Sequence, residues 1–280
     1  MDWLDNWNRA MEYLEEHLEE ELDLKELGKL AGCSAYHFQR MFSYLAGVPL
    51  HEYIRRRRMT LAAAELQSGE KVLDVALRFG YESPTSFNRA FQALHGIPPS
   101  EAKQSGVKLK AFSRIRFKFI LKGAEEMEYQ IVKEKAFRIV GFRTPQPSDA
   151  EESFRVIPQF WSEVGSRIGE LLPLMNSNPS GILGICTCNE TENHYYIAVA
   201  SSAPVPEGMY EWTVPAASWA VFSGAGSLPF AIQDLQKRIV SEWLPDSGYE
   251  WAQAPDVEVY LDPPGGAESR FQVWLPVTKR

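Results

Sequence analysis

The sequence predicts two domains of different fold class, an all-α N-terminal domain and an α+β C-terminal domain. In the first 105 residues, apolar residues recur at intervals of three and four, which is the spacing of amphipathic helices. From residue 127 onward, short runs of alternating apolar and polar residues, typical of strands, are interrupted by two helical segments. We place the domains at residues 1–106 and 127–280, with residues 107–126 as a linker or as the first strand of the second domain.

One segment of the N-terminal domain occurs twice, at an offset of about 49 residues. SAYHFQRMFSYLAGVP begins at Ser34 and SPTSFNRAFQALHGIPP begins at Ser83. In each copy a short helix is followed by a glycine, Gly32 or Gly80, which suits a tight turn. The serine that follows can cap a second helix. A short helix, a glycine turn and a helix with a polar exposed face describe a helix-turn-helix unit, and the chain is predicted to contain two.

The two second helices are predicted to expose different polar faces. The first face consists of Tyr36, Gln39, Arg40 and Ser43, and the second of Thr85, Asn88, Arg89 and Gln92, with Ser86 beside it. Such side chains bond to base edges and phosphates. One such helix alone is more simply an ordinary surface helix, but its repetition in register favours DNA binding. Because only the arginine recurs, we expect the partner to be double-stranded DNA with an asymmetric site.

The charge distribution is compatible with this partner although the net charge is −8. Residues 1–24 hold one arginine and nine acidic residues, whereas residues 25–108 hold twelve Lys and Arg and seven acidic residues. The doubled segment therefore lies in a basic stretch. Four consecutive arginines, Arg55 to Arg58, occupy the predicted long helix between the copies. We expect one or two of them to contact DNA phosphates and at least one to pair with an acid.

Several motifs in this domain resemble those of the AraC/XylS-type transcription regulators, over about residues 5–105. They are GCSAYHFQRMF, YIRRRRMTLAAAEL, DVALRFGYESPTSFNRAF and GIPPSEAK. The resemblance implies two helix-turn-helix units on a linker helix, promoter DNA as the partner and, for an activator, contact with RNA polymerase. It also implies two sets of base-reading positions, namely Tyr36, Gln39 and Arg40, and Pro84, Thr85, Ser86, Asn88 and Arg89. Pro84 has no N–H to donate, so its position is doubtful as a reader.

The C-terminal domain reads as a ββαββ pattern that occurs twice, and a groove where two such halves meet is a usual place for a small ligand. In the strand-like run PDVEVYLD, alternation puts Glu258 and Tyr260 on one face. A carboxylate beside an aromatic ring attracts an apolar cation. The alternative for Glu258 is an ordinary solvated strand residue.

FRIVGF, IPQFWSEV, SWAVFSG, IVSEWLPDSGYE and PDVEVYL resemble the gyrase-inhibitor-like (GyrI-like) effector-binding domain, over about residues 127–278. In that family a glutamate of the penultimate strand lies in the ligand groove, and Glu258 falls at that position. The resemblance further implies Tyr260, Trp219 and Trp161 as ligand-binding residues. The expected effector is a small lipophilic or cationic molecule.

Other classes of function find little support. The chain has no apolar run long enough to span a membrane, no secretory signal, and none of the motifs GxSxG, HExxH, P-loop or GxGxxG. The Cys186–Thr–Cys188 spacing favours alternating strand residues over a metal site. We therefore expect a cytoplasmic regulator with no catalytic residues, metal or cofactor. Two alternatives stay open, a small-molecule hydrolase using Glu258 with Tyr195 or Tyr260, and a module that binds a protein partner.

Overall fold

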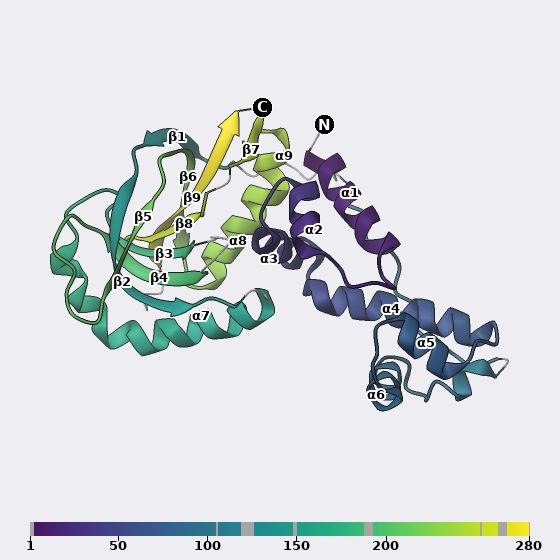
Figure 1. Cartoon of the computed structure of the whole chain (residues 1–280). Coiled ribbons are helices and arrows are strands. Elements are labelled where there is room, and N and C mark those ends of the chain that lie inside the picture. Colours follow the sequence, from purple (N-terminus) through teal and green to yellow (C-terminus); the bar gives the residue numbers. More distant parts are fainter. Residues whose placement is uncertain are drawn as a thin grey trace. The chain divides into compact units, whose positions relative to one another are not determined.

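The computed structural model describes residues 3–104, 106–118, 126–147, 150–187, 193–252, 254–262 and 268–279 (Figure 1). The chain divides into two compact units, a helical unit in its N-terminal part and a β-sheet unit in its C-terminal part. The predicted combination of an all-α domain with an α+β domain is confirmed.

The helical unit is built from two helix-turn-helix units joined by a long helix. Its helices are α1 (Trp3–Glu16), α2 (Leu24–Ala31), α3 (Ala35–Ala46), α4 (Leu50–Gln67), α5 (Val72–Arg78) and α6 (Pro84–His95), followed by a 3-10 turn at Glu101–Lys103. The turns α2–α3 and α5–α6 contain Gly32 and Gly80, each with φ of 78°. This left-handed conformation suits glycine, because a Cβ atom makes it unfavourable for other residues.

Two aromatic cores support these helices. In the first, Trp7 of α1 stacks on Phe38 of α3 with ring centroids 4.9 Å apart. In the second, Met59 and Leu66 of α4 pack with the buried residues of α5 and α6, including Phe87 and Phe91. Trp7, Phe38, Leu66, Phe87 and Phe91 belong to the apolar stripes that the periodicity predicts, whereas Met59 was not among the predicted core residues of α4.

Residues 107–118 do not form the first strand of the sheet. They belong to the helical unit as an extended segment with no strand assignment, and their backbone N–H groups donate to side chains of α1 and α4. Residues 119–125 of the predicted linker lie outside the described residues. The first strand of the sheet begins at Tyr129.

The sheet unit contains one antiparallel sheet and the helices packed on it. Its elements are β1 (Tyr129–Glu134), β2 (Phe137–Pro145), α7 (Ala150–Val164), β3 (Ile182–Thr187), β4 (His194–Ala200), β5 (Tyr210–Val214), β6 (Ala217–Gly226), α8 (Phe230–Arg238), α9 (Leu244–Asp246), β7 (Tyr249–Trp251), β8 (Val257–Tyr260) and β9 (Ser269–Lys279). Turns of 3-10 helix at Gly165–Glu170 and Leu172–Leu174 follow α7, and a π-helical turn at Ile239–Trp243 follows α8. Helix α7 contacts β4, and α8 contacts β6 and β9 (Figure 1).

The strand order confirms the internal duplication. It runs β1-β6-β9-β8-β3-β4-β2-β5, with β7 added beside β9. The first half of this order repeats the second half in reverse, so that β1, β6, β9 and β8 correspond to β5, β2, β4 and β3. The two halves meet where β8 pairs with β3, and in that pairing Glu258 lies opposite Gly184.

Candidate nucleic-acid interface and effector site

Helix α6 presents the predicted polar face to solvent. Thr85, Asn88, Arg89 and Gln92 are all exposed and lie at i, i+3, i+4 and i+7, which is one face of a helix. The helix begins as the sequence predicts, because the Ser83 hydroxyl accepts a hydrogen bond from the Ser86 N–H at 3.1 Å and Pro84 takes the first position. It ends at Gly96, which has φ of 81°.

The Ser86 hydroxyl helps to begin this helix. It donates to the Ser83 carbonyl oxygen at 2.8 Å and accepts from the Ser83 hydroxyl at 3.0 Å. A contact from Ser86 to a base edge requires at least the donated bond to break. Ser86 is exposed, so base reading by Ser86 stays a prediction. Thr85, Asn88 and Arg89 are the stronger candidates of the predicted set, because the Ser86 hydroxyl is already bonded to Ser83.

Helix α3 carries the first predicted set in the same register. Tyr36, Gln39, Arg40 and Ser43 follow one another at i, i+3, i+4 and i+7. Unlike their counterparts on α6, Tyr36, Gln39 and Arg40 are buried and Ser43 is half-buried, so the predicted exposure of this face is not seen. The Ser43 hydroxyl donates to the Gln39 carbonyl oxygen at 3.0 Å, so it is bound within its own helix. The Ser34 hydroxyl accepts from the His37 N–H at 3.2 Å, which confirms the predicted cap.

The four consecutive arginines of α4 mainly serve the fold. Arg55 and Arg56 pair with Glu52 at 2.7 and 2.6 Å. Arg57 pairs with Glu15 at 2.8 Å, and Arg58 donates to the carbonyl oxygens of Leu18 and Glu20, both at 2.7 Å. Pairing with acids is therefore confirmed. A phosphate contact remains a prediction for Arg55 and Arg56, whose side chains are 42% and 33% exposed.

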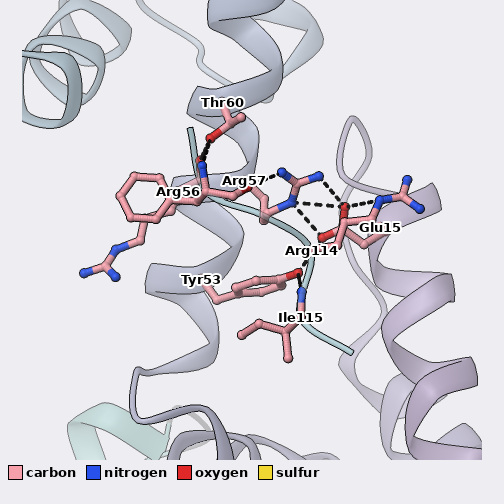
Figure 2. Close-up of polar contacts among 8 residues, drawn as sticks. Glu15, Tyr53, Arg56, Arg57, Thr60, Arg114 and Ile115 are labelled. Carbon is pink, nitrogen blue, oxygen red and sulfur yellow. Dashed lines mark hydrogen bonds and ion pairs between the residues drawn. The ribbon is translucent and has the colours of Figure 1, made fainter. Parts of the chain in front are cut away.

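Glu15 is a buried acid that sequence periodicity missed. Its carboxylate accepts hydrogen bonds from Arg57 Nε at 2.9 Å and from Tyr53 Oη at 2.5 Å, and pairs with Arg114 Nε at 3.1 Å (Figure 2). Burial alone raises the pKa of Glu15, but the hydrogen bonds from Arg57 and Tyr53 outweigh burial and hold the pKa below its usual range. We call Glu15, Tyr53, Arg57 and Arg114 the Glu15 cluster.

In the sheet unit, Glu258 lies among polar and aromatic side chains from four elements. Glu258 Oε1 accepts from Gln236 Nε2 of α8 at 2.8 Å, and Oε2 accepts from Tyr260 Oη at 2.8 Å. Trp161 of α7 meets the Tyr260 ring edge-on at 4.9 Å, and its Nε1 donates to Tyr195 Oη of β4 at 3.0 Å. We call Trp161, Tyr195, Gln236, Glu258 and Tyr260 the Glu258 cluster.

The Tyr195 hydroxyl lies close to the carboxylate. A Cβ atom on Gly184 would fall 2.4 Å from Tyr195 Oη and 3.0 Å from Glu258 Oε2, so both groups converge over this glycine. Burial raises the pKa of Tyr195 well above its usual value of 10, and the charge of Glu258 raises it further. Tyr195 is therefore a neutral phenol at physiological pH.

The structure brings together Glu258, Tyr260 and Trp161, but not Trp219. Trp219 is fully buried in the core on the opposite face of the sheet, with Val257 and Val259. Glu258 lies between those two valines in β8, and alternation along a strand turns it to the other face. The assignment of Trp219 to the ligand site was therefore wrong.

The sequence reasoning also missed Gln236 and Gly184. Gln236 is a buried polar residue of α8, and its only signal was a position beside the apolar stripe. Gly184 interrupts a strand of apolar residues, which often marks the close approach of another group.

Neither metal ligands nor membrane spans are found in the described ranges. Cys186 is buried in β3, and Cys188 lies outside the described residues. Where the structure describes the chain, no three His, Cys, Asp or Glu side chains gather as a metal site would require. Among the helices so described, none combines the length and hydropathy needed to cross a bilayer.

Comparisons with known proteins match both units. A family model described as integron-associated effector binding protein matches residues 130–277, and a helix-turn-helix domain model matches residues 27–105. The HTH-type transcriptional activator AarP of Providencia stuartii is 42% identical over 89 residues, which are 31% of this chain and 66% of AarP. The chain therefore spans just under two thirds of AarP. The regulatory protein SoxS of Salmonella typhimurium is 37% identical over 92 residues, which are 32% of this chain and 86% of SoxS.

Among solved structures, SAV2435 bound to tetraphenylphosphonium is 23% identical with a TM-score of 0.46, over 54% of this chain and 94% of that one. The family matches cover the doubled motif in one unit and the duplicated sheet in the other. The chain thus belongs to the AraC-type helix-turn-helix transcription regulators and joins their DNA-binding domain to an effector-binding domain of the integron-associated family.

Proposed function

We propose that this regulator recognises an asymmetric site on promoter DNA and changes its activity when the Glu258 cluster binds a lipophilic cation. The observation that carries the DNA part is the pair of unlike polar faces in one register. Helix α3 carries Tyr36 and Gln39 at the positions where α6 exposes Thr85 and Asn88. Arginine and asparagine make bidentate contacts with guanine and adenine, so both helices have the chemistry for base readout.

The charge of Glu258 supports a cationic effector. Gln236 and Tyr260 are neutral donors, so they orient the carboxylate without cancelling its charge. Trp161 and Tyr260 add aromatic rings beside it. A large cation gains from both the negative charge and the ring faces, whereas an anion of the same shape is repelled.

A titration of the full chain tests the effector. Tetraphenylphosphonium and tetraphenylborate have nearly the same shape and opposite charge, and Trp161 places a fluorophore in the cluster. We expect saturable quenching by the cation, no comparable response to the borate, and at least tenfold weaker cation binding in Glu258→Gln. Equal responses to the two ions would contradict a charge-selective site. A flat response to a broad panel of cations would favour the alternative, a surface for a protein partner.

Mobility shifts with the full chain test DNA binding. A duplex selected from a random pool should be bound with an affinity that falls steeply as salt rises, since phosphate contacts release counterions. Replacing Arg89 with alanine should weaken discrimination at particular base pairs by ~1–3 kcal/mol. Binding that is equal for selected and random duplexes would overturn the proposal.

We further propose that the Glu258 cluster binds its ligand without turnover, and that the protein acts in the cytoplasm beside RNA polymerase as an activator. The raised pKa of Tyr195 disfavours the tyrosinate that a general base would need. Incubation with aryl esters and epoxides should therefore give no product above the buffer rate. Hydrolysis that disappears in Glu258→Gln would establish an enzyme instead. An activator should raise transcription in vitro when RNA polymerase, promoter DNA and this protein are combined, and no rise would contradict that role.

A further inference from the structure

Residues 107–118, which we call the strap, run along the helical unit and reach both of its cores. Near its start, Leu109 and Phe112 pack against the second core, with Phe87 and Phe91. Near its end, the Phe117 ring lies edge-on to Trp7 at 5.4 Å and to Phe42 at 6.5 Å, in the first core. The alternating pattern that resembles a strand thus packs one set of half-buried side chains against two helical cores.

Backbone hydrogen bonds attach the strap at both ends. At the second core, the Lys110 N–H donates to His95 Nδ1 at 3.2 Å and the Phe112 N–H to Thr60 Oγ1 at 3.0 Å. At the first core, the Phe117 N–H donates to Asn8 Oδ1 at 3.0 Å, and Asn8 Nδ2 returns a bond to the Phe117 carbonyl oxygen at 3.1 Å. The partners are therefore side chains of α6, α4 and α1.

The Glu15 cluster binds the middle of the strap through hydrogen bonds and an ion pair. Arg57 donates to the Phe112 carbonyl oxygen as well as to Glu15, and Arg114 of the strap pairs with Glu15 at 3.1 Å (Figure 2). Tyr53 Oη accepts from the Ile115 N–H at 3.1 Å while it donates to Glu15. Buried polar groups of this kind persist only when their partners stay in place, so the cluster holds the strap against α4 and α1 together.

We infer that the strap is a splint that fixes the orientation of the two helix-turn-helix units and thereby the spacing of the half-sites that they read. Without it, the units are joined through α4, and long helices bend. A second connection, fastened to both cores, restricts bending and twisting of α4. The inference rests on the proposed DNA binding. It adds positioning residues, Asn8 and Thr60, that lie on neither reading face.

Half-site spacing gives the test. Thr60→Val removes the acceptor for the Phe112 N–H at the second core, and Asn8→Leu removes both hydrogen bonds to the Phe117 backbone at the first core. Thr60→Ser is the matched control that keeps the hydroxyl. Affinity is measured by mobility shift for the selected duplex and for duplexes with one base pair inserted or deleted between the half-sites. The wild-type chain and Thr60→Ser should lose at least tenfold affinity on either change. The double variant, Thr60→Val with Asn8→Leu, should lose at most threefold affinity, because its two helix-turn-helix units can reorient to fit the changed spacing.

A double variant that folds but shows the wild-type spacing penalty would overturn the inference. If the double variant melts below the assay temperature, Thr60→Val alone carries the test, with an intermediate penalty expected and an unchanged one contradicting the splint.

A measurement without DNA separates failure of the splint from failure of the proposed function. Spin labels carried by non-natural amino acids at the exposed positions Lys29 and Gln92 report the distance between the two units. The distance distribution should broaden in the double variant and stay narrow in Thr60→Ser. Equal widths would contradict the splint whether or not the chain binds DNA.

Discussion

Replacing Glu15 with glutamine should destabilise the helical unit far more than the same replacement at an exposed acid of the same helix. The Glu15 and Arg57 side chains are only 3% and 8% exposed. Glutamine has nearly the same shape, but it removes the negative charge that faces Arg57, Tyr53 and Arg114. The buried Arg57 guanidinium then keeps its positive charge without the carboxylate that balanced it, and the Phe112 carbonyl oxygen remains as an acceptor.

Removing one partner of a buried ion pair costs about 3–5 kcal/mol. That is a large share of the ~5–15 kcal/mol by which a typical protein is stable. For a domain of this size, 1 kcal/mol corresponds to roughly 4–8 °C in melting temperature, so the helical transition should fall by about 12 °C or more.

Circular dichroism and calorimetry of the full chain measure the effect, with Glu16→Gln as the control because Glu16 is the exposed neighbour. Glu16→Gln should lie within about 0.5 kcal/mol of the wild type. The double replacement Glu15→Leu with Arg57→Met should be less harmful than Glu15→Gln alone, since it leaves no unpaired buried charge at either position. If Glu15→Gln and Glu16→Gln melt together, the buried pair does not stabilise this unit as argued.

Three other outcomes are expected. The folded-state pKa of Glu15 is lowered from 4.5, so the stability that its carboxylate contributes is present above pH about 4.5 and is lost as the pH falls through that value toward the folded pKa. The melting temperature measured from pH 6 to pH 3 should therefore depend less on pH in Glu15→Gln than in the wild type, and parallel curves would refute this. Gly184→Ala places a methyl group against the buried Tyr195 hydroxyl and should destabilise the sheet unit by ~1–3 kcal/mol and weaken tetraphenylphosphonium binding at least tenfold, unlike Gly165→Ala, whose methyl meets nothing within 4 Å. Ser83→Ala removes the cap of α6 and should cost ~0.5–2 kcal/mol in the helical transition and reduce DNA affinity, and an unchanged melt would show that the cap is dispensable.

Local signals were enough to predict the helices that carry the DNA-reading residues. Ser83, Pro84 and Gly96 mark the ends of α6 by chemistry that acts within a few residues, and the structure places them as expected. Gly32 and Ser34 predicted α3 in the same way, and the repetition of the motif then favoured DNA binding over two ordinary surface helices. Features that depend on neighbours in sequence are in this way accessible without a structure.

Features that depend on distant residues were missed or misjudged. Glu15 looks like one more solvated acid of an amphipathic helix, because its partner Arg57 lies 42 residues away. Trp219 was assigned to the ligand site on aromatic character and resemblance, yet only the pairing of β6 and β9 shows which face of the sheet it occupies. The strap alternates like a strand, but its apolar side chains pack, half-buried, against helical cores instead of a sheet. In each case the sequence contains the residue type, and the tertiary arrangement decides its role.

The most direct test of the central claim is a comparison of the DNA motifs selected by the wild-type chain, Gln39→Ala and Asn88→Ala from one random duplex pool. The wild type should select two unlike half-sites in a fixed order, about one helical turn apart. Gln39→Ala should relax base preference in one half-site and Asn88→Ala in the other, each leaving the remaining half-site unchanged. A palindromic wild-type motif, or relaxation of the same half-site by both replacements, would contradict a single chain that reads an asymmetric site with α3 and α6.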